Sequence, residues 1–172
     1  MISRHLCKLV FLLIVAATLL RPVSVHAVLK IGQPLPAFSA TTPLGQQVTN
    51  QNYSGRVLLL VFSTDYCSAC KKAAPSIGKL AGRYGKQGFH VLGLFSGFGM
   101  DNDDLKEYMN TYGVTYPMAL FEQRVASEQF GLISVPYSLL VGKKGVISGV
   151  YYGYSDETMK QLEDQVKKLL AE

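Results

Sequence analysis

The chain of 172 residues contains no tryptophan, only three cysteines and three histidines, and no long apolar run. So few cysteines exclude the multiple disulfides that hold many small exported domains together. The longest apolar run covers residues 9–20. It falls short of the roughly 20 residues that a membrane-spanning helix needs. The chain also lacks internal repeats and low-complexity segments.

Residues 1–27 have the three parts of a secretory signal peptide. Arg4 and Lys8 precede the apolar run, and small residues stand at Val25 and Ala27, the two positions that a signal peptidase reads. We expect cleavage after Ala27 and an extracytoplasmic, in the first instance periplasmic, protein. A retained membrane anchor is the alternative.

Removal of this segment changes both the charge and the cysteine count. Three of the five excess positive charges lie in residues 1–27, so the remaining chain carries a formal net charge of +2. Such a weak and dispersed charge argues against nucleic-acid binding, which requires a basic stripe. Cys7 is removed as well, which leaves Cys67 and Cys70 as a single close pair.

The remaining 145 residues are enough to bury one hydrophobic core, so we expect one domain. Residues 28–55 contain several prolines and only short apolar pieces, which predict an irregular lead-in with one small hairpin. Residues 56–172 alternate apolar runs with helical periods. This alternation predicts an α/β fold in which a mixed sheet lies between helices.

The apolar run at residues 57–62 has no polar break, which predicts a strand that is covered on both faces and central in the sheet. Asp101 and Asn102 are both plausible N-caps for one helix, and Ser155 is a suitable N-cap for the last helix. The last two strands are separated by a four-residue turn and should form an antiparallel hairpin. Further strands are predicted at residues 89–95, 117–121, 137–141 and 146–152, and helices begin near residues 67, 102, 124 and 156.

The tetrapeptide Cys67-Ser68-Ala69-Cys70 lies where the strand at 57–62 ends and a helical pattern begins. A helix that starts at Cys67 brings the two side chains within disulfide reach and directs unpaired backbone N–H groups at the first sulfur. This favours a thiolate there. The pattern therefore indicates a thiol-disulfide redox centre.

A static structural disulfide and a metal site are the alternatives for this pair. A zinc site would need two further ligands. After removal of residues 1–27 the chain offers one histidine, His90, which we expect at the surface or at an edge of the sheet. We therefore predict no metal.

Taken together, these features resemble the thioredoxin superfamily, and more narrowly the exported TlpA/ResA type of thiol-disulfide oxidoreductase. The resemblance covers nearly the whole mature chain and depends on the order and spacing of several short motifs. It implies a thioredoxin-like three-layer fold, with a mixed central sheet flanked by helices and an N-terminal extension. The motifs are Gly32-Gln33-Pro34, Tyr66-Cys67-Ser68-Ala69-Cys70, Pro75, Tyr112-Gly113-Val114, Val135-Pro136 and Gly145-Val146-Ile147.

The resemblance also implies roles for individual residues. Cys67 is then the exposed nucleophile that attacks a substrate disulfide, and Cys70 is the better-buried cysteine that resolves the mixed disulfide. Pro136 is expected to be cis and to lie across from the pair. There the backbone of Val135, together with Tyr66, would hold an extended substrate peptide.

The same resemblance implies that no cofactor is needed and that the substrates are protein disulfides. A membrane-embedded thiol transporter would supply the electrons. A reductant is favoured over an oxidant, and cytochrome c maturation is a candidate pathway.

The sequence departs from the family pattern close to the cysteines. Tyr66 replaces the usual Trp, Ala73 stands where some cytochrome-maturation members have Glu, and Val61 stands where thioredoxin has a buried Asp. No buried carboxylate is therefore evident as a proton acceptor for Cys70. Asp65 is the nearest acid in the sequence and a candidate tuning residue, although a solvated position at the helix start is the commoner role for such a residue.

Two other functions stay open. A thioredoxin-fold module could hold peptides at the Pro136 edge without catalysis. A thiol peroxidase is also considered, because Thr64 and Cys67 form the Thr-x-x-Cys of peroxiredoxins, although the upstream proline of those enzymes is Leu60 here. Residues 96–99 lack the spacing of a phosphate loop. We interpret them as a loop near the active edge of the sheet.

Overall fold

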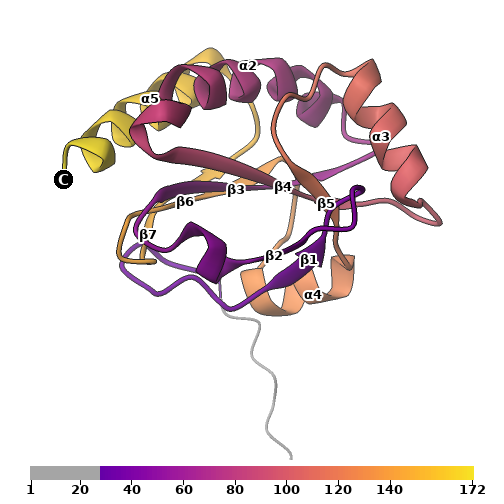
Figure 1. Ribbon diagram of the computed structural model, residues 1–172, viewed down its shortest axis with the longest axis horizontal. Coiled ribbons are helices and arrows are strands. Elements are labelled where there is room, and N and C mark those ends of the chain that lie inside the picture. Colours follow the sequence, from indigo (N-terminus) through magenta and orange to yellow (C-terminus); the bar gives the residue numbers. More distant parts are fainter. Residues whose placement is uncertain (1–27) are drawn as a thin grey trace, which may run out of the picture.

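A seven-stranded mixed sheet forms the middle layer of the computed structural model, which describes residues 28–172 (Figure 1). The predicted signal peptide, residues 1–27, lies outside the described residues. The strands follow the order β2-β1-β5-β4-β3-β6-β7 across the sheet. Their bounds are Ser39–Thr41 (β1), Gln47–Thr49 (β2), Val57–Thr64 (β3), Phe89–Ser96 (β4), Met118–Leu120 (β5), Tyr137–Val141 (β6) and Ile147–Tyr152 (β7).

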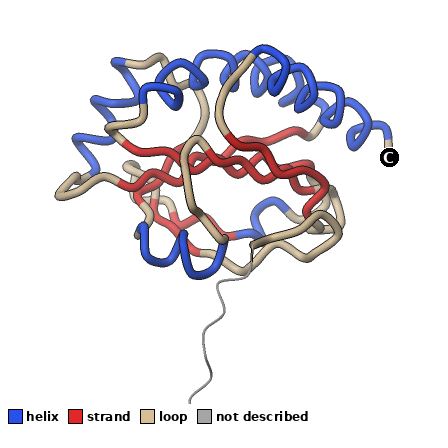
Figure 2. The backbone as a smooth tube through the Cα atoms, turned by 180° about the vertical axis from the view of Figure 1, so that it is seen from behind, coloured by secondary structure: helices blue, strands red, loops and turns tan. Residues whose placement is uncertain are grey.

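Helices cover both faces of this sheet, and the view from behind shows the strands between two outer layers (Figure 2). Helices α2, α3 and α5 lie on one face, and α4 lies on the other (Figure 1). The predicted three-layer α/β fold is therefore confirmed. The bounds are Ser68–Tyr84 (α2), Asn102–Thr111 (α3), Gln123–Phe130 (α4) and Asp156–Ala171 (α5), with short 3-10 helices at Asn50–Tyr53 (η1) and Gly85–Gln87 (η2).

Strand β3 divides the core into two parts because successive side chains of a strand point to opposite faces. All eight of its residues are buried. Val57, Leu59 and Val61 join the core cluster that contains the buried residues of α2 and α5. Leu58, Leu60 and Phe62 join the cluster that contains Ala126 and Phe130 of α4. Burial on both faces explains why the sequence of β3 has no polar break.

The predicted hairpin in the lead-in is present, but it belongs to the main sheet. β1 and β2 pair antiparallel, and Thr41 of β1 lies opposite Leu120 of β5. The hairpin thus adds two strands beyond β5, and β4 occupies the middle position of the sheet. The expectation that β3 is central is therefore wrong, although β3 lies in the interior between β4 and β6.

Of the two candidate caps for α3, Asp101 is the N-cap and Asn102 is the first helical residue, and the predicted N-cap Ser155 of α5 is confirmed. The Asp101 carboxylate accepts hydrogen bonds from the backbone N–H groups of Asp103 and Asp104, at 2.8 Å and 3.1 Å. These bonds lower the pKa of Asp101. Ser155 accepts from the N–H of Thr158 at 3.1 Å. Both helices therefore begin where a side-chain oxygen satisfies a free backbone donor.

The sequence placed His90 at the surface or at an edge of the sheet; His90 is partly exposed, but it lies on an interior strand. It is the second residue of β4, the middle strand, and is half-buried. Its Nε2 lies 2.8 Å from Nη1 of Arg56. Burial, followed by the positive charge of Arg56, lowers the pKa of His90.

The loops that contain the candidate site residues lie at one edge of the sheet. β3, β4 and β5 run parallel, so their carboxyl ends lie at the same edge. β6 runs antiparallel to β3, and Tyr137, its first residue, lies opposite Phe62. The segment that precedes β6 therefore arrives at this edge as well, which we call the carboxyl edge. None of the helices in residues 28–172 combines the length and the hydropathy that a bilayer crossing requires.

Candidate redox site

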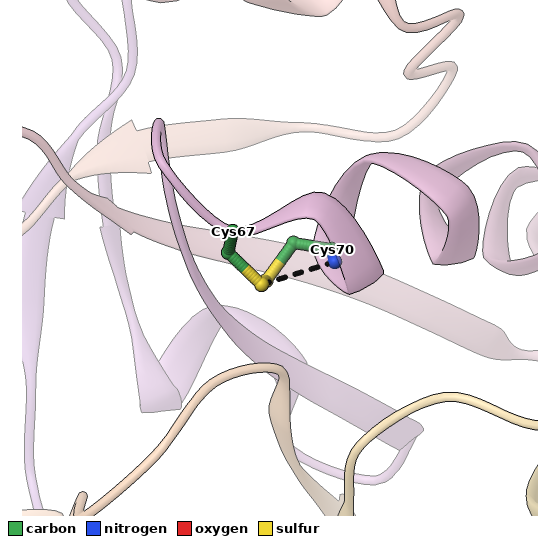
Figure 3. Close-up of a disulfide and its surroundings, with 2 residues drawn as sticks. All are labelled: Cys67 and Cys70. Atoms are coloured by element: carbon green, nitrogen blue, oxygen red, sulfur yellow. Dashed lines mark hydrogen bonds between the residues drawn. A yellow bond between two sulfur atoms is a disulfide. The ribbon is translucent and has the colours of Figure 1, made fainter.

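Cys67 and Cys70 form a disulfide at the start of α2 (Figure 3). Cys67 is the N-cap residue, with extended backbone angles, and the helix begins at Ser68. The Cα atoms of the two cysteines are 5.2 Å apart, within the range that a disulfide bridges. The helical spacing expected from the sequence is thus present.

The first sulfur receives a backbone hydrogen bond. The N–H of Cys70 donates to Sγ of Cys67 at 3.0 Å (Figure 3). In the reduced protein the thiolate of Cys67 would take the place of this disulfide sulfur. A helix N-terminus stabilises negative charge, and so does a donated N–H. The site is therefore arranged to stabilise a thiolate at Cys67.

Both cysteines are largely covered. Cys67 retains 8% of its possible exposure and Cys70 retains 4%. Cys70 is the less exposed of the two, which agrees with its expected role as the better-buried, resolving cysteine. The exposure of Cys67 is nevertheless small, so Cys67 is not the exposed residue that the family resemblance implied.

The segment before β6 reaches the carboxyl edge, the edge at which β3 ends shortly before the cysteine pair. The Val135–Pro136 bond is cis, as the family resemblance implied. Pro136 is buried, and its carbonyl accepts the N–H of Gly153 at 2.8 Å. Val135 is half-buried, and its backbone makes no hydrogen bond with another residue of the described chain. Its N–H and C=O are therefore free to pair with an incoming strand.

Asp65 is not simply solvated at the helix start. Its side chain is half-buried, and its Oδ1 is covered from solvent without a hydrogen-bond partner among residues 28–172. The hydroxyl of Tyr108, on α3, is near enough to Asp65 for the carboxylate to affect its pKa. Burial first, then Tyr112 and the charge of Asp65, raise the pKa of Tyr108 to about 12. α3 thus supplies Tyr108 as a neighbour of Asp65 that the sequence did not indicate.

The two lysines after Cys70 have different surroundings. Nζ of Lys71 lies 4.9 Å from the centre of the Tyr112 ring, a cation–π contact that ties the first turns of α2 to α3. Lys72 is exposed. Ala73 and Val61 are buried in the core, so the positions that hold acids in some relatives are apolar here.

Tyr66, which the family resemblance assigned to substrate binding, is 71% exposed. Phe98, in the loop after β4, is fully exposed and was not identified from the sequence as a site residue. The sequence predicted a loop at residues 96–99 near the active edge of the sheet, but it did not show that Phe98 lines the same cavity as Tyr66. Within residues 28–172, no three His, Cys, Asp or Glu side chains gather in a way that could hold a metal ion.

Comparison with known proteins gives one family and several relatives. The profile of the AhpC/TSA family matches residues 31–150. The thiol-disulfide oxidoreductase ResA of Bacillus anthracis is 27% identical over 143 residues, which cover 82% of this chain and 79% of the relative. The thioredoxin-like protein YneN of Bacillus subtilis is 26% identical over 135 residues, 78% of each chain.

A solved structure supports the same fold. The thioredoxin domain of a thiol-disulfide oxidoreductase from Bacteroides vulgatus superimposes with a TM-score of 0.70 at 21% identity. The match covers 80% of this chain and 99% of that domain. The thioredoxin-like fold expected from the sequence is therefore confirmed.

Proposed function

This chain belongs to the AhpC/TSA family, and from that membership and the geometry of its cysteine pair we propose that it is an extracytoplasmic reductant of protein disulfides. It is a thiol-disulfide oxidoreductase of the thioredoxin fold, with relatives of the ResA type. The observation that carries the proposal is the hydrogen bond from the Cys70 N–H to Sγ of Cys67 at the helix N-cap. It supports Cys67 as the sulfur whose negative charge the protein stabilises.

The reaction consists of two exchanges between sulfur atoms. The Cys67 thiolate attacks one sulfur of a substrate disulfide, and the other substrate sulfur leaves as a thiolate that takes a proton. The thiol of Cys70 then loses its proton and attacks Sγ of Cys67. This second step releases the reduced substrate and forms the Cys67–Cys70 disulfide present in the structure. Two electrons have then moved from the protein to the substrate.

Substrate would bind as an extended segment beside Val135. The free backbone groups of Val135 can hydrogen-bond to the segment, as in strand addition to a sheet. The exposed ring of Tyr66 offers an apolar surface next to the attacking sulfur. We propose that these two residues position the substrate cysteine over Cys67.

Export and electron supply complete the proposal. The signal-like residues 1–27 support an extracytoplasmic location. A membrane-embedded thiol transporter would reduce the disulfide again, and cytochrome c maturation is the pathway that we propose to test first. The direction is decided by the reduction potential, because about 30 mV changes the equilibrium of a two-electron couple tenfold.

The test is substrate trapping with Cys70→Ser in the native host. This variant can form the mixed disulfide on Cys67 but cannot resolve it, so partners should accumulate as adducts. Adducts with cytochrome apoproteins would support the maturation pathway, whereas adducts confined to oxidoreductases of another pathway would refute it. Cell fractionation of the same strain tests the location.

A matched control separates catalysis from binding. Cys67→Ser should form no adducts and should lose reduction of insulin completely. If it instead supports full function in the host, the protein acts as a non-catalytic peptide-binding module. Consumption of peroxide that exceeds disulfide reduction by the wild type would favour the thiol peroxidase.

A further inference from the structure

A cavity of about 430 Å³ is lined in part by Asp65 and Tyr66, the two residues that precede Cys67. Its lining comes from the segments that follow β3, β4 and β5, which meet at the carboxyl edge. This volume lies within the range of about 300–1,000 Å³ that is typical of ligand sites. The residues used below are Asp65 and Tyr66 after β3, Phe98 and Met100 after β4, and Phe121 and Glu122 after β5.

The sheet order places this cavity on the opposite side of Cys67 from Val135. β3 lies between β4 and β6, so the chain that leaves β3 toward Cys67 has the loops of β4 and β5 on one side. The segment that ends at Pro136 lies on its other side. A substrate strand that pairs with Val135 and presents its cysteine to Cys67 would therefore lie between the segment before β6 and the cavity, so that its side chains can reach the cavity.

The cavity offers an apolar surface that the fold itself does not use. Phe98 is fully exposed and Tyr66 is 71% exposed. Exposed aromatic side chains that border a concave surface are characteristic of recognition sites. Met100 and Phe121 continue this apolar surface inside the cavity. The surface fits a large aliphatic or aromatic side chain.

The charge of the cavity is negative. Asp65 and Glu122 line it, and none of the described residues in its lining is Lys or Arg. Glu122 lies 3.9 Å from the guanidinium of Arg124, but Asp65 forms no salt bridge within residues 28–172. Oδ1 of Asp65 also lacks a hydrogen-bond partner. A carboxylate that is half-buried and unpaired favours a cationic donor beside it.

We propose that this cavity is a specificity subsite for the substrate segment next to the reacting cysteine. It receives a large apolar side chain against Phe98 and Tyr66, and it pairs a neighbouring Lys or Arg with Asp65. The occupant is thus an extended segment of a protein substrate, apolar and basic beside its cysteine. The inference rests on the proposed function, because it names the substrates of the same disulfide exchange.

The experiment uses four synthetic peptides, each with one cysteine held as a mixed disulfide with thionitrobenzoate. They differ only in the two residues that flank the cysteine on the side of the cavity: Phe-Lys, Ser-Lys, Phe-Glu or Ser-Glu. The release of thionitrobenzoate by the reduced full-length protein gives the rate. Each rate is divided by the rate of the same variant with 2-hydroxyethyl disulfide, which has no peptide to fill the cavity.

The wild type should prefer Phe to Ser about tenfold, the discrimination that a hydrophobic pocket provides. It should prefer Lys to Glu about fivefold, as expected for one partly exposed ion pair. Phe98→Ser should remove the first preference and Asp65→Asn the second. Leu44→Ser is the matched control, because Leu44 is exposed and apolar but lies in the β1–β2 turn, away from the carboxyl edge.

Four equal peptide rates with normal reduction of 2-hydroxyethyl disulfide would overturn the subsite and leave the proposed function standing. Failure to reduce any of these disulfides would refute the proposed function itself. The same loss of preference in Leu44→Ser would also overturn the subsite. If Phe98→Ser dissociates a dimer in sedimentation and leaves the peptide preferences intact, a second copy of the chain occupies the cavity and the proposal is wrong.

Discussion

Replacement of Cys70 by proline removes one hydrogen-bond donor from the redox site. The donor is the N–H of Cys70, which lies 3.0 Å from Sγ of Cys67. Proline has no N–H, and it is tolerated in the first turn of a helix, where the donor has no partner inside the helix. Cys70→Ala is the matched control, because it lacks the same sulfur but keeps the N–H. The two variants therefore differ in whether residue 70 has a backbone N–H.

The magnitude follows from the strength of this bond. A hydrogen bond to a charged group contributes about 1.5–3 kcal/mol. One pKa unit corresponds to 1.36 kcal/mol, so loss of the donor should change the pKa of Cys67 by about 1–2 units. The donor stabilises the thiolate, which is the charged form, so its removal raises the pKa. The helix dipole remains in both variants and does not contribute to the difference.

The assay is the pH dependence of thiolate absorbance in the ultraviolet, together with the rate of alkylation by iodoacetamide. Circular dichroism establishes that both variants keep their helices, which matters because proline also restricts Ala69. Cys70→Ser keeps the N–H and should agree with Cys70→Ala. Equal Cys67 pKa values in the folded proline and alanine variants would refute the idea that this bond stabilises the thiolate.

Three further predictions concern stability. Phe62→Ala should cost about 3–5 kcal/mol in urea unfolding, because Phe62 is fully buried against three aromatic rings, and a loss below about 1 kcal/mol would contradict that packing. Tyr84→Phe should cost about 1 kcal/mol at neutral pH by removing the 2.6 Å hydrogen bond to Glu163 that joins α2 to α5. That cost should shrink in acid as Glu163, whose pKa this bond lowers, becomes protonated, and a cost that does not change with pH would argue against the bond. Because the pKa of His90 is lowered in the folded protein, the unfolded chain binds a proton at this residue more readily. The free energy of unfolding therefore has its full value, as far as His90 is concerned, above pH 6.5. It decreases as the pH falls from 6.5 toward the lowered pKa of the folded state. His90→Gln should make the midpoint of urea unfolding depend less on pH over this range. If the midpoint of the variant changes with pH as much as that of the wild type, His90 is not responsible.

Much of the fold was predictable because its signals are local. The unbroken apolar run at 57–62 indicated a strand buried on both faces, and β3 is such a strand. Asp101 and Ser155 cap the helices that follow them, since capping depends only on residues within one turn. The final hairpin was predictable for the same reason.

The errors concern position in the sheet. β4 is the middle strand because the β1–β2 hairpin pairs with β5, and His90 is consequently an interior-strand residue. Thr41 and Leu120 meet across the sheet although they are far apart in the sequence. Periodicity shows which face of a strand is buried, but it does not show which strand is its neighbour.

The sequence by itself determined the chemistry of this protein. The spacing of Cys67 and Cys70 at a helix start places two sulfurs and a backbone donor together, since one turn of helix fixes that geometry. Only the tertiary structure decided what surrounds the pair. Asp65, Tyr66 and Phe98 line one cavity because parallel β3 and β4 end at the same edge, and that depends on contacts between distant parts of the chain.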